Sequence, residues 1–258
     1  MKSACLLGWL VCLCWPVHVM AAVSVTVSGD VERPGMQTLG GNVRLADVAA
    51  AAQVRPDAYM LGASWTQRSR VMEQRRLQAG LLYELGAVAD QAHRGGDASF
   101  SALSASLRDW LQAMPVTGRR VARTLDPGAM AASSADNLPV DDGDTLSYPR
   151  RPSTVRVVGA VNAPCELPHV ALQDARRYVE ACPTRFADRD SLFVIQPDGQ
   201  VFELGIALWN ASPPMALAPG AIVYVPLDKR RTAGAADAVF NREMADFIAT
   251  QPMGGVPP

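Results

Sequence analysis

The sequence has few of the residues that metal and redox sites require. It contains three histidines and five cysteines among 258 residues. Three of the cysteines, Cys5, Cys12 and Cys14, fall in an apolar N-terminal stretch, and the histidines beyond it, His93 and His169, are far apart. A structural zinc site takes four ligands that converge on one point. The sequence therefore predicts no metal site.

Recognisable catalytic motifs are also missing. The chain has no G-x-S-x-G, no H-E-x-x-H, no P-loop and no dinucleotide-binding fingerprint. The run DDGD at residues 141–144 would suit calcium or a carboxylate pair, but it lacks the other ligands of a calcium loop, and Asp-Gly is ordinary turn chemistry. A nucleophile pair of Cys165 and His169 has nothing further to support it. We predict no catalytic residue and no cofactor.

An excess of charge of either sign is absent as well. The formal net charge is −1 at pH 7. Nucleic acids and anionic membrane surfaces attract strongly basic proteins, so neither is predicted as a partner. Beyond the first 22 residues, no apolar run is long enough to cross a bilayer. We therefore expect no stable membrane span in the mature protein.

The first 21 residues have the form of a secretory signal peptide. Lys2 is their only charge, residues 4–20 are mostly apolar, and the small residues Ala21 and Ala22 follow. The alternative is a membrane anchor, which the short run and Pro16 disfavour. Cleavage is placed after Ala21, with Ala22 as the alternative, and the mature protein is predicted to be soluble and exported.

Cys165 and Cys182 are the cysteines left after the leader is removed. Exported proteins meet an oxidising compartment, where two cysteines are a candidate disulfide. A bridge that closes so short a loop contributes about 3 kcal/mol when it is unstrained. We predict that these two residues are bonded.

An internal repeat organises the rest of the chain. VTVSGDVERPG at residues 25–35 matches VRVVGAVNAPC at residues 155–165, with valines, a glycine and a proline in the same places. The alternation predicts a half-buried strand, and the glycine and proline predict the turn of a hairpin. Short helices at residues 45–52 and 172–179 follow, each with an acidic residue near its start. A small mixed sheet packed on one helix, made twice, is the simplest architecture.

A longer segment at residues 64–115 interrupts the first unit. SWTQ at residues 64–67 has the form of a capping box, and leucines then recur at helical spacing. HRGGD at residues 93–97 breaks this helix, and Ser99 can cap a second one with an apolar stripe. The pattern predicts an inserted helical hairpin whose two stripes form each other's core.

The C-terminal region predicts one more helix, at residues 233–250. Its apolar side chains lie mostly on one side, and Pro252 with two glycines ends it. Such a helix docks on its own domain or on a partner, and the sequence leaves both open.

Taken in order, these features resemble the capsule-biosynthesis GfcC-like family. The resemblance rests on the two units introduced by VSGDVERPG and VVGAVNAPC, the hairpin in the first, PVTGR at residues 115–119, and the amphipathic terminal helix. It covers essentially the whole mature chain. It implies an α+β fold of two tandem β-grasp (ubiquitin-like) domains, similar to the soluble-ligand-binding domains of polysaccharide export proteins such as Wza.

The resemblance also implies a division of the chain. A β-grasp domain would occupy residues 22–150, with the hairpin inserted at about 64–115. A second would occupy residues 153–230, followed by the amphipathic helix at 233–250. The export-signature domain of the outer-membrane exporters is absent from this sequence, so an accessory component is expected rather than a channel.

Members of this family are periplasmic proteins of Gram-negative bacteria, encoded with capsule or exopolysaccharide export genes. The resemblance therefore implies a non-enzymatic periplasmic accessory protein that binds polysaccharide or the outer-membrane polysaccharide export machinery. The alternative is a periplasmic enzyme that modifies or trims polysaccharide, with carboxylates near the hairpin junction. Two facing carboxylates in one cleft would distinguish the enzyme.

Arginine supplies the candidate binding residues. Arg119, Arg120 and Arg123 surround the strand that leaves the hairpin, and arginine forks bind the carboxylates of acidic sugars. The family resemblance implies a pocket role for an arginine after the hairpin, and Arg119 matches that position. We expect Arg119 to line an open cleft, where its removal would change stability little. The arginines on the hairpin's first helix are interpreted as a solvated face.

Overall fold

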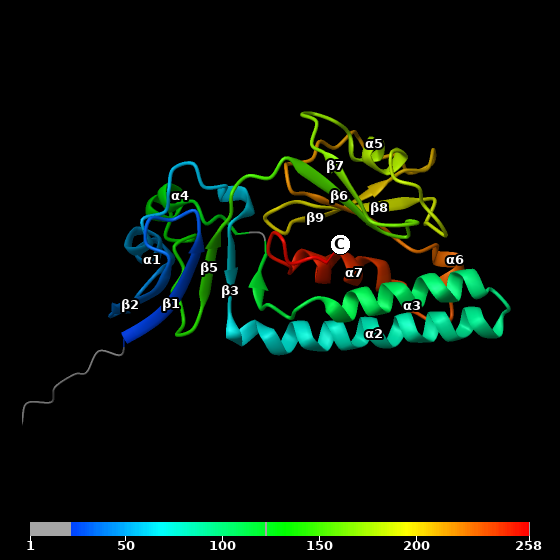
Figure 1. Cartoon of the computed structure of the whole chain (residues 1–258), viewed down its shortest axis with the longest axis horizontal. Coiled ribbons are helices and arrows are strands. Elements are labelled where there is room, and N and C mark those ends of the chain that lie inside the picture. The colour runs from blue at the N-terminus through cyan, green and yellow to red at the C-terminus, as the bar shows by residue number, and fades with distance from the viewer. Residues whose placement is uncertain (1–21, 122, 258) are drawn as a thin grey trace, which may run out of the picture.

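The structure is a computed structural model that describes residues 22–121 and 123–257. The predicted signal peptide at residues 1–21 lies outside this range. Two five-stranded mixed sheets follow one another along the chain (Figure 1). This is the predicted α+β class with two tandem domains. Across the described residues, the helices are all too short or too polar to span a membrane.

The two sheets have the same topology. The first has the order β2-β1-β5-β3-β4 and the second β7-β6-β10-β8-β9. In each, the opening strand pairs antiparallel with its hairpin partner and parallel with the closing strand. The strands are β1 (Ala22–Gly29), β2 (Gly35–Gly40), β3 (Ser64–Thr66), β4 (Arg119–Arg120), β5 (Thr145–Tyr148), β6 (Thr154–Gly159), β7 (Cys165–Pro168), β8 (Ser191–Ile195), β9 (Val201–Gly205) and β10 (Ile222–Val225).

The repeated sequence therefore occupies the same place in both sheets. Val25 and Val27 are buried while Thr26 between them is exposed, as the alternation predicts. The repeated glycine has a steric cause. Gly29 and Gly159 have φ of 93° and 103°, and a Cβ on either would lie about 2 Å from a carbonyl oxygen of the parallel neighbour strand. A side chain at these positions would push the opening and closing strands apart.

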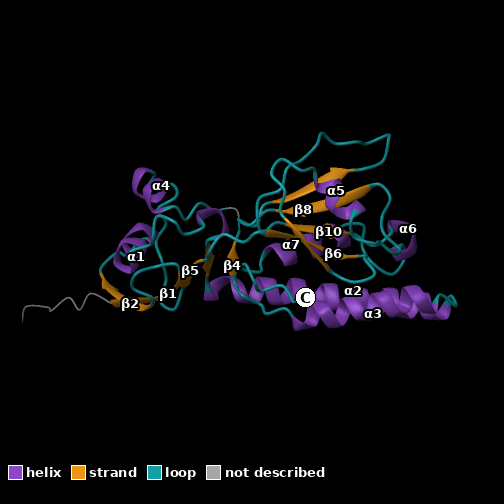
Figure 2. Cartoon of the chain, turned by 45° about the horizontal axis from the view of Figure 1, so that its top comes forward, coloured by secondary structure: helices purple, strands orange, loops and turns teal. Residues whose placement is uncertain are grey.

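The helices divide between the sheets and the insertion. They are α1 (Leu45–Ala52), α2 (Val71–Arg94), α3 (Ala98–Ala113), α4 (Pro127–Ala132), α5 (Ala175–Glu180), α6 (Lys229–Thr232) and α7 (Phe240–Ala249), with 3-10 turns η1 (Met60–Gly62) and η2 (Arg68–Arg70). The long pair α2 and α3 is the predicted hairpin (Figure 2).

Its start differs from the sequence prediction. Ser64–Thr66 forms strand β3 instead of a helix cap, because Trp65 is buried between strands and pairs with Leu146 of β5. The helix begins only at Val71. The second helix is capped by Asp97, whose side chain accepts from the backbone N–H of Phe100, and not by Ser99.

The hairpin packs mainly on the second unit, although it is inserted in the first. Buried residues of α2 and α3 share one hydrophobic core with the second sheet and α7, and a separate core lies against the first sheet. At the hairpin tip, Arg231 pairs with Asp97 and stacks 4.8 Å from the ring centre of Phe186. The two stripes of the hairpin are thus only part of a larger core.

The terminal helix docks on its own chain. Helix α7 lies between the hairpin and the second sheet (Figures 1 and 2), and Phe240, Met244, Phe247 and Ile248 are almost fully buried. It is shorter than predicted, because the chain turns at Gly234, whose φ is 83°. Helix α7 therefore completes a core that the hairpin and sheet would otherwise expose.

Candidate functional site

A disulfide joins Cys165 to Cys182, as the sequence predicts. Cys165 opens β7, and Cys182 follows helix α5, so the bridge ties the second unit's hairpin to its helix. The Cα atoms are 6.0 Å apart, within the usual range. Cys165 also borders a cavity.

This cavity, of about 450 Å³, lies beside the second sheet near the end of α7. Strands β6, β8 and β10 supply part of its wall, and the segment after α7 supplies another part. Much of the lining is proline, isoleucine and glycine. Its polar residues are Arg119, Thr154, Arg156, Glu166, Gln196 and Gln251.

Arg119 reaches the cavity from the junction between hairpin and first sheet. Gly118 makes the turn with φ of 72°, and a Cβ there would lie 2.2 Å from the carbonyl oxygen of Gln67. Gln74 holds both sides of the turn, because its side chain accepts from the N–H of Gly118 and donates to the carbonyl of Arg119. The backbone thus fixes where the guanidinium enters.

The guanidinium itself is buried, contrary to the exposed setting expected from the sequence. Arg119 is 4% exposed and donates to the backbone carbonyls of Pro197, Ala249 and Gln251 at 2.5 to 3.2 Å. Burial lowers the pKa of Arg119 to about 10, an effect that the carboxylate of Asp198 opposes. The side chain therefore keeps its positive charge at neutral pH.

Two buried polar atoms at the cavity are not hydrogen-bonded within the described part of the chain. They are the Nε donor of Arg119 and the Oε1 acceptor of Gln251. Buried polar groups without a protein partner are rare, and an ordered water, an ion or a ligand can complete their bonding. A ligand that both accepts and donates hydrogen bonds fits this pair.

Arg156 is the second cation of the cavity, and the sequence analysis did not single it out. It stands on β6, partly buried, and donates to the carbonyls of Val256 and Pro257 at 2.7 and 2.5 Å. Burial lowers its pKa, while the carboxylate of Glu166 raises it. The sequence did contain a signal for Arg156. It lies between the buried Val155 and Val157, and side chains along a strand alternate, so Arg156 points to the face of the sheet opposite to these valines.

The other two candidate arginines lie away from the cavity. Arg120 stacks over the Trp65 ring at 5.4 Å, and Arg123 is exposed. Burial lowers the pKa of Arg120, and the nearby charges of Arg123 and Arg70 act in the same direction. Neither residue is among those that line the cavity. The structure thus separates Arg119 from its two neighbours in sequence.

The acidic run at residues 141–144 forms a turn. Asp144 is 1% exposed and accepts from the indole Nε1 of Trp65 and from the N–H of Asp141. Burial raises the pKa of Asp144, and these hydrogen bonds oppose the shift. Within residues 22–121 and 123–257, no cluster of three or more His, Cys, Asp or Glu residues is placed to hold a metal ion.

Comparison with known families assigns this arrangement to a class of protein. Residues 20–148 match the N-terminal domain of the capsule biosynthesis protein GfcC, and residues 163–252 match its C-terminal domain. The chain belongs to this capsule-biosynthesis family.

A curated relative matches over most of its length. The chain is 29% identical to the protein YjbG of Escherichia coli (strain K12), described as uncharacterized, over 216 residues that cover 82% of each chain. A match of 216 residues is longer than either unit, so the similarity extends over both units.

Proposed function

We propose that this protein is a non-enzymatic periplasmic accessory protein for capsule or exopolysaccharide assembly and export, and that its cavity binds an acidic saccharide. Membership of a capsule-biosynthesis family supports the process. The observation that carries the binding role is the buried guanidinium of Arg119, whose Nε is not hydrogen-bonded to any described protein group.

The charges of the cavity favour an anionic ligand. Arg119 and Arg156 bring two guanidinium groups to a lining with one carboxylate, that of Glu166, among the described residues. Guanidinium groups bind carboxylates by charge-assisted hydrogen bonds. Gln251 Oε1 adds an acceptor for a sugar hydroxyl. A uronic acid or a similar acidic sugar combines both kinds of group.

The number of carboxylates in the cavity lining favours binding over hydrolysis. Glycoside hydrolases of the common kind use two carboxyl groups on either side of the scissile bond. Within the described part of the chain, Glu166 lines this cavity without a second carboxylate. Glu166 is also engaged, because it accepts a hydrogen bond of 2.8 Å from Thr154.

The proposal is tested with acidic oligosaccharides prepared from the exopolysaccharide of the producing strain. Calorimetry should show binding to the exported protein, and Arg156→Gln should weaken it about tenfold or more, since a lost charge-assisted contact is worth roughly 1.5–3 kcal/mol. Arg76→Gln, an exposed arginine on α2, is the matched control and should bind as the unaltered protein does.

Two results would contradict the proposal. Equal binding by Arg156→Gln and the unaltered protein would remove the cavity from the binding site. Release of shorter sugars from the oligosaccharides would indicate the enzyme instead. Cell fractionation tests the compartment, where a cytoplasmic protein that keeps its leader would be inconsistent with the periplasmic assignment.

A further inference from the structure

An exposed tryptophan lies on the second unit, outside the cavity. Trp209 is 76% exposed, whereas Trp65 is 1% exposed and Trp110 is partly buried. It follows β9, an edge strand of the second sheet. Leu208, which precedes it, is fully exposed as well. Adjoining exposed apolar side chains of this kind are a candidate interaction site.

The loop that carries Trp209 is held by its own side chains. Asn210 donates to the carbonyl of Asp190 and accepts from the N–H of Ala207. Ser212 closes the loop, because its Oγ accepts from the N–H of Gly205 while its N–H donates to the Gly205 carbonyl. The tryptophan is thus presented by an ordered turn, which reduces the entropy lost when a ligand binds.

Glycine is required at the base of this loop. A Cβ on Gly205 would lie 2.0 Å from the carbonyl oxygen of Asn210. Arg176 also donates to the carbonyls of Gly205 and Ser212, at 3.0 and 2.6 Å. Helix α5 therefore braces the loop from the body of the second unit.

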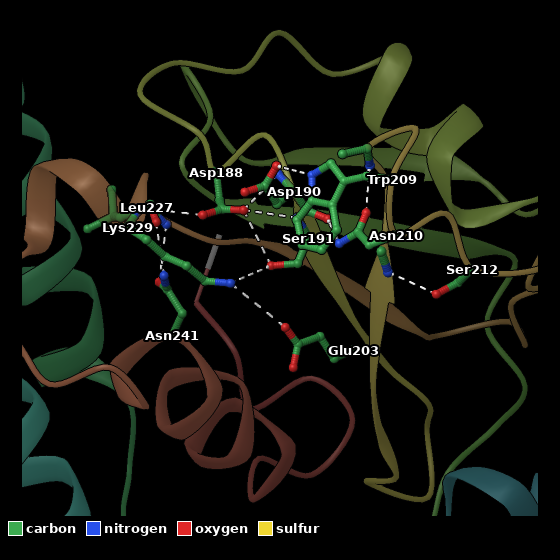
Figure 3. Close-up of polar contacts among 12 residues, drawn as sticks. Asp188, Asp190, Ser191, Glu203, Trp209, Asn210, Ser212, Leu227, Lys229 and Asn241 are labelled. Atoms are coloured by element: carbon green, nitrogen blue, oxygen red, sulfur yellow. Dashed lines mark hydrogen bonds and ion pairs between the residues drawn. The ribbon is translucent and has the colours of Figure 1, made fainter.

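A hydrogen bond at one edge of the indole ring orients Trp209. Its Nε1 donates to Oδ1 of Asp190 at 3.4 Å (Figure 3). A contact at the ring edge leaves the aromatic faces to solvent, in agreement with the high exposure. Asp190 is positioned in turn by the buried carboxylate of Asp188, which accepts from its N–H.

Polar side chains from β8, β9 and α6 continue away from the ring. Ser191 adjoins Asp190 in sequence, and Lys229 Nζ lies 3.2 Å from Ser191 Oγ and 3.9 Å from Glu203 Oε1 (Figure 3). Lys229 and Glu203 are exposed. This surface offers both donors and acceptors next to an aromatic face.

We propose that Trp209 is a stacking platform for a pyranose ring of a polysaccharide chain. The C–H groups of one sugar face would pack on the indole, and Asp190 would accept from a sugar hydroxyl at the ring edge. Glu203 and Lys229 would contact hydroxyls of the adjoining sugar. This surface is separate from the cavity, and the proposal takes its ligand class, a saccharide, from the proposed function.

The surroundings favour a saccharide over a protein partner. Tryptophans that anchor protein interfaces enter apolar pockets, surrounded by a rim that excludes water. The groups positioned around Trp209 are instead a carboxylate, an amide and a Lys–Glu pair. Leu208 is the apolar neighbour, and it is fully exposed. An aliphatic side chain offers no ring face for stacking, so Leu208 separates ring stacking from general apolar contact in a binding experiment.

Fluorescence quenching tests the platform directly. In protein purified from the periplasm, acrylamide should quench Trp209 far more than Trp65 or Trp110, because those rings are covered. Oligosaccharides of about six to ten sugars, prepared from the strain's own exopolysaccharide, should protect it from acrylamide. Trp209→Ala should bind them roughly tenfold more weakly, as expected for the loss of one aromatic contact, and Trp209→Phe should recover most of that loss.

Leu208→Ala is the matched control and should keep its affinity within about twofold. Equal affinity of Trp209→Ala and the unaltered protein, or no protection from acrylamide, would overturn the platform. Equal losses in Leu208→Ala and Trp209→Ala would also overturn it, because the loss of saccharide affinity would then not depend on an aromatic ring face. Arg156→Gln in parallel separates the two proposals, because it weakens the cavity and leaves the protection of Trp209 unchanged.

Discussion

The guanidinium of Arg119 donates a hydrogen bond of 2.8 Å to the backbone carbonyl of Gln251, a residue 132 positions further along the chain. The same guanidinium bonds Pro197, in the turn between β8 and β9. One side chain thus ties the junction of the first unit to both the second sheet and the end of α7. Arg119 is therefore a structural residue as well as a cavity residue.

Replacing Arg119 by alanine should destabilise the protein. The change removes three hydrogen bonds from a charged donor group to backbone carbonyls, offset in part by relief of a buried charge. We expect a loss of about 1–3 kcal/mol, or a fall in Tm of roughly 3–10 °C for a chain of this size. Thermal unfolding followed by circular dichroism measures it.

Arg76→Ala is the control, because Arg76 is exposed on α2 and its loss should leave Tm within about 2 °C. An Arg119→Ala protein that melts with the unaltered one would show that the three carbonyls find other donors.

The disulfide should be formed in exported protein and should stabilise the second unit. Thiol labelling of denatured, unreduced protein should find Cys165 and Cys182 blocked. Reduction, or a Cys165→Ser/Cys182→Ala double variant, should lower the free energy of unfolding by about 3 kcal/mol, as the chain-entropy estimate gives for a loop of this length. Two reactive thiols without reductant would contradict the pairing.

The pH dependence of stability should carry a contribution from Asp144. Burial raises the pKa of this carboxyl in the folded state, so the folded protein holds the proton more tightly than the unfolded chain does. That contribution is fully present below the unfolded pKa of about 3.9 and is lost as pH rises through the folded value. Relative to Asp144→Asn, the unaltered protein should therefore gain stability as pH falls from 7 toward 4.

Urea unfolding of both proteins at several pH values gives this difference directly, since contributions from other groups cancel. Asp90→Asn, at an exposed position on α2, is the matched control for the loss of one carboxylate. A difference between Asp144→Asn and the unaltered protein that grows in the opposite direction would mean that hydrogen bonds from Trp65 and Asp141 outweigh burial.

Removing the end of the chain should make Arg156 available. Its guanidinium now bonds the carbonyls of Val256 and Pro257, and Trp110 Nε1 donates to Pro257 as well. A chain that ends at Gly254 should bind acidic oligosaccharides more tightly by calorimetry. Its Arg156 no longer has to break hydrogen bonds to Val256 and Pro257 before it bonds the ligand. Its tryptophan emission should shift to the red as Trp110 meets water. Weaker binding by the shortened chain would mean that the tail is part of the binding surface.

The features that could be predicted from the sequence depend on neighbours along the chain. The alternation in β1 and β6, the repeated Gly29 and Gly159, and the helical spacing of the insertion are all local patterns. They were sufficient to place the same opening strand in both units and to predict the inserted hairpin. The SWTQ prediction was wrong because its capping pattern is equally local. The burial of Trp65 depends instead on Leu146, which lies 81 positions further along the chain.

The site was harder to predict, for the same reason. Arg119 could be placed at a junction, but its acceptors come from Pro197, Ala249 and Gln251, which no local pattern links to it. Its burial therefore could not be foreseen. Arg156 and Trp209 are single residues in a strand and a loop, and only the folded arrangement sets them beside the cavity and at the polar surface.

The position of α7 has a consequence for how the protein is made. Synthesis proceeds from the N-terminus, and domains commonly fold as they emerge. Here the hairpin and the second sheet are complete by Val225, yet both await Phe240–Ala249 to cover their apolar surfaces. A nascent or truncated chain that stops before Phe240 would expose those surfaces together, which invites aggregation or proteolysis. Folding of this half of the molecule is therefore delayed until almost the whole chain has been delivered.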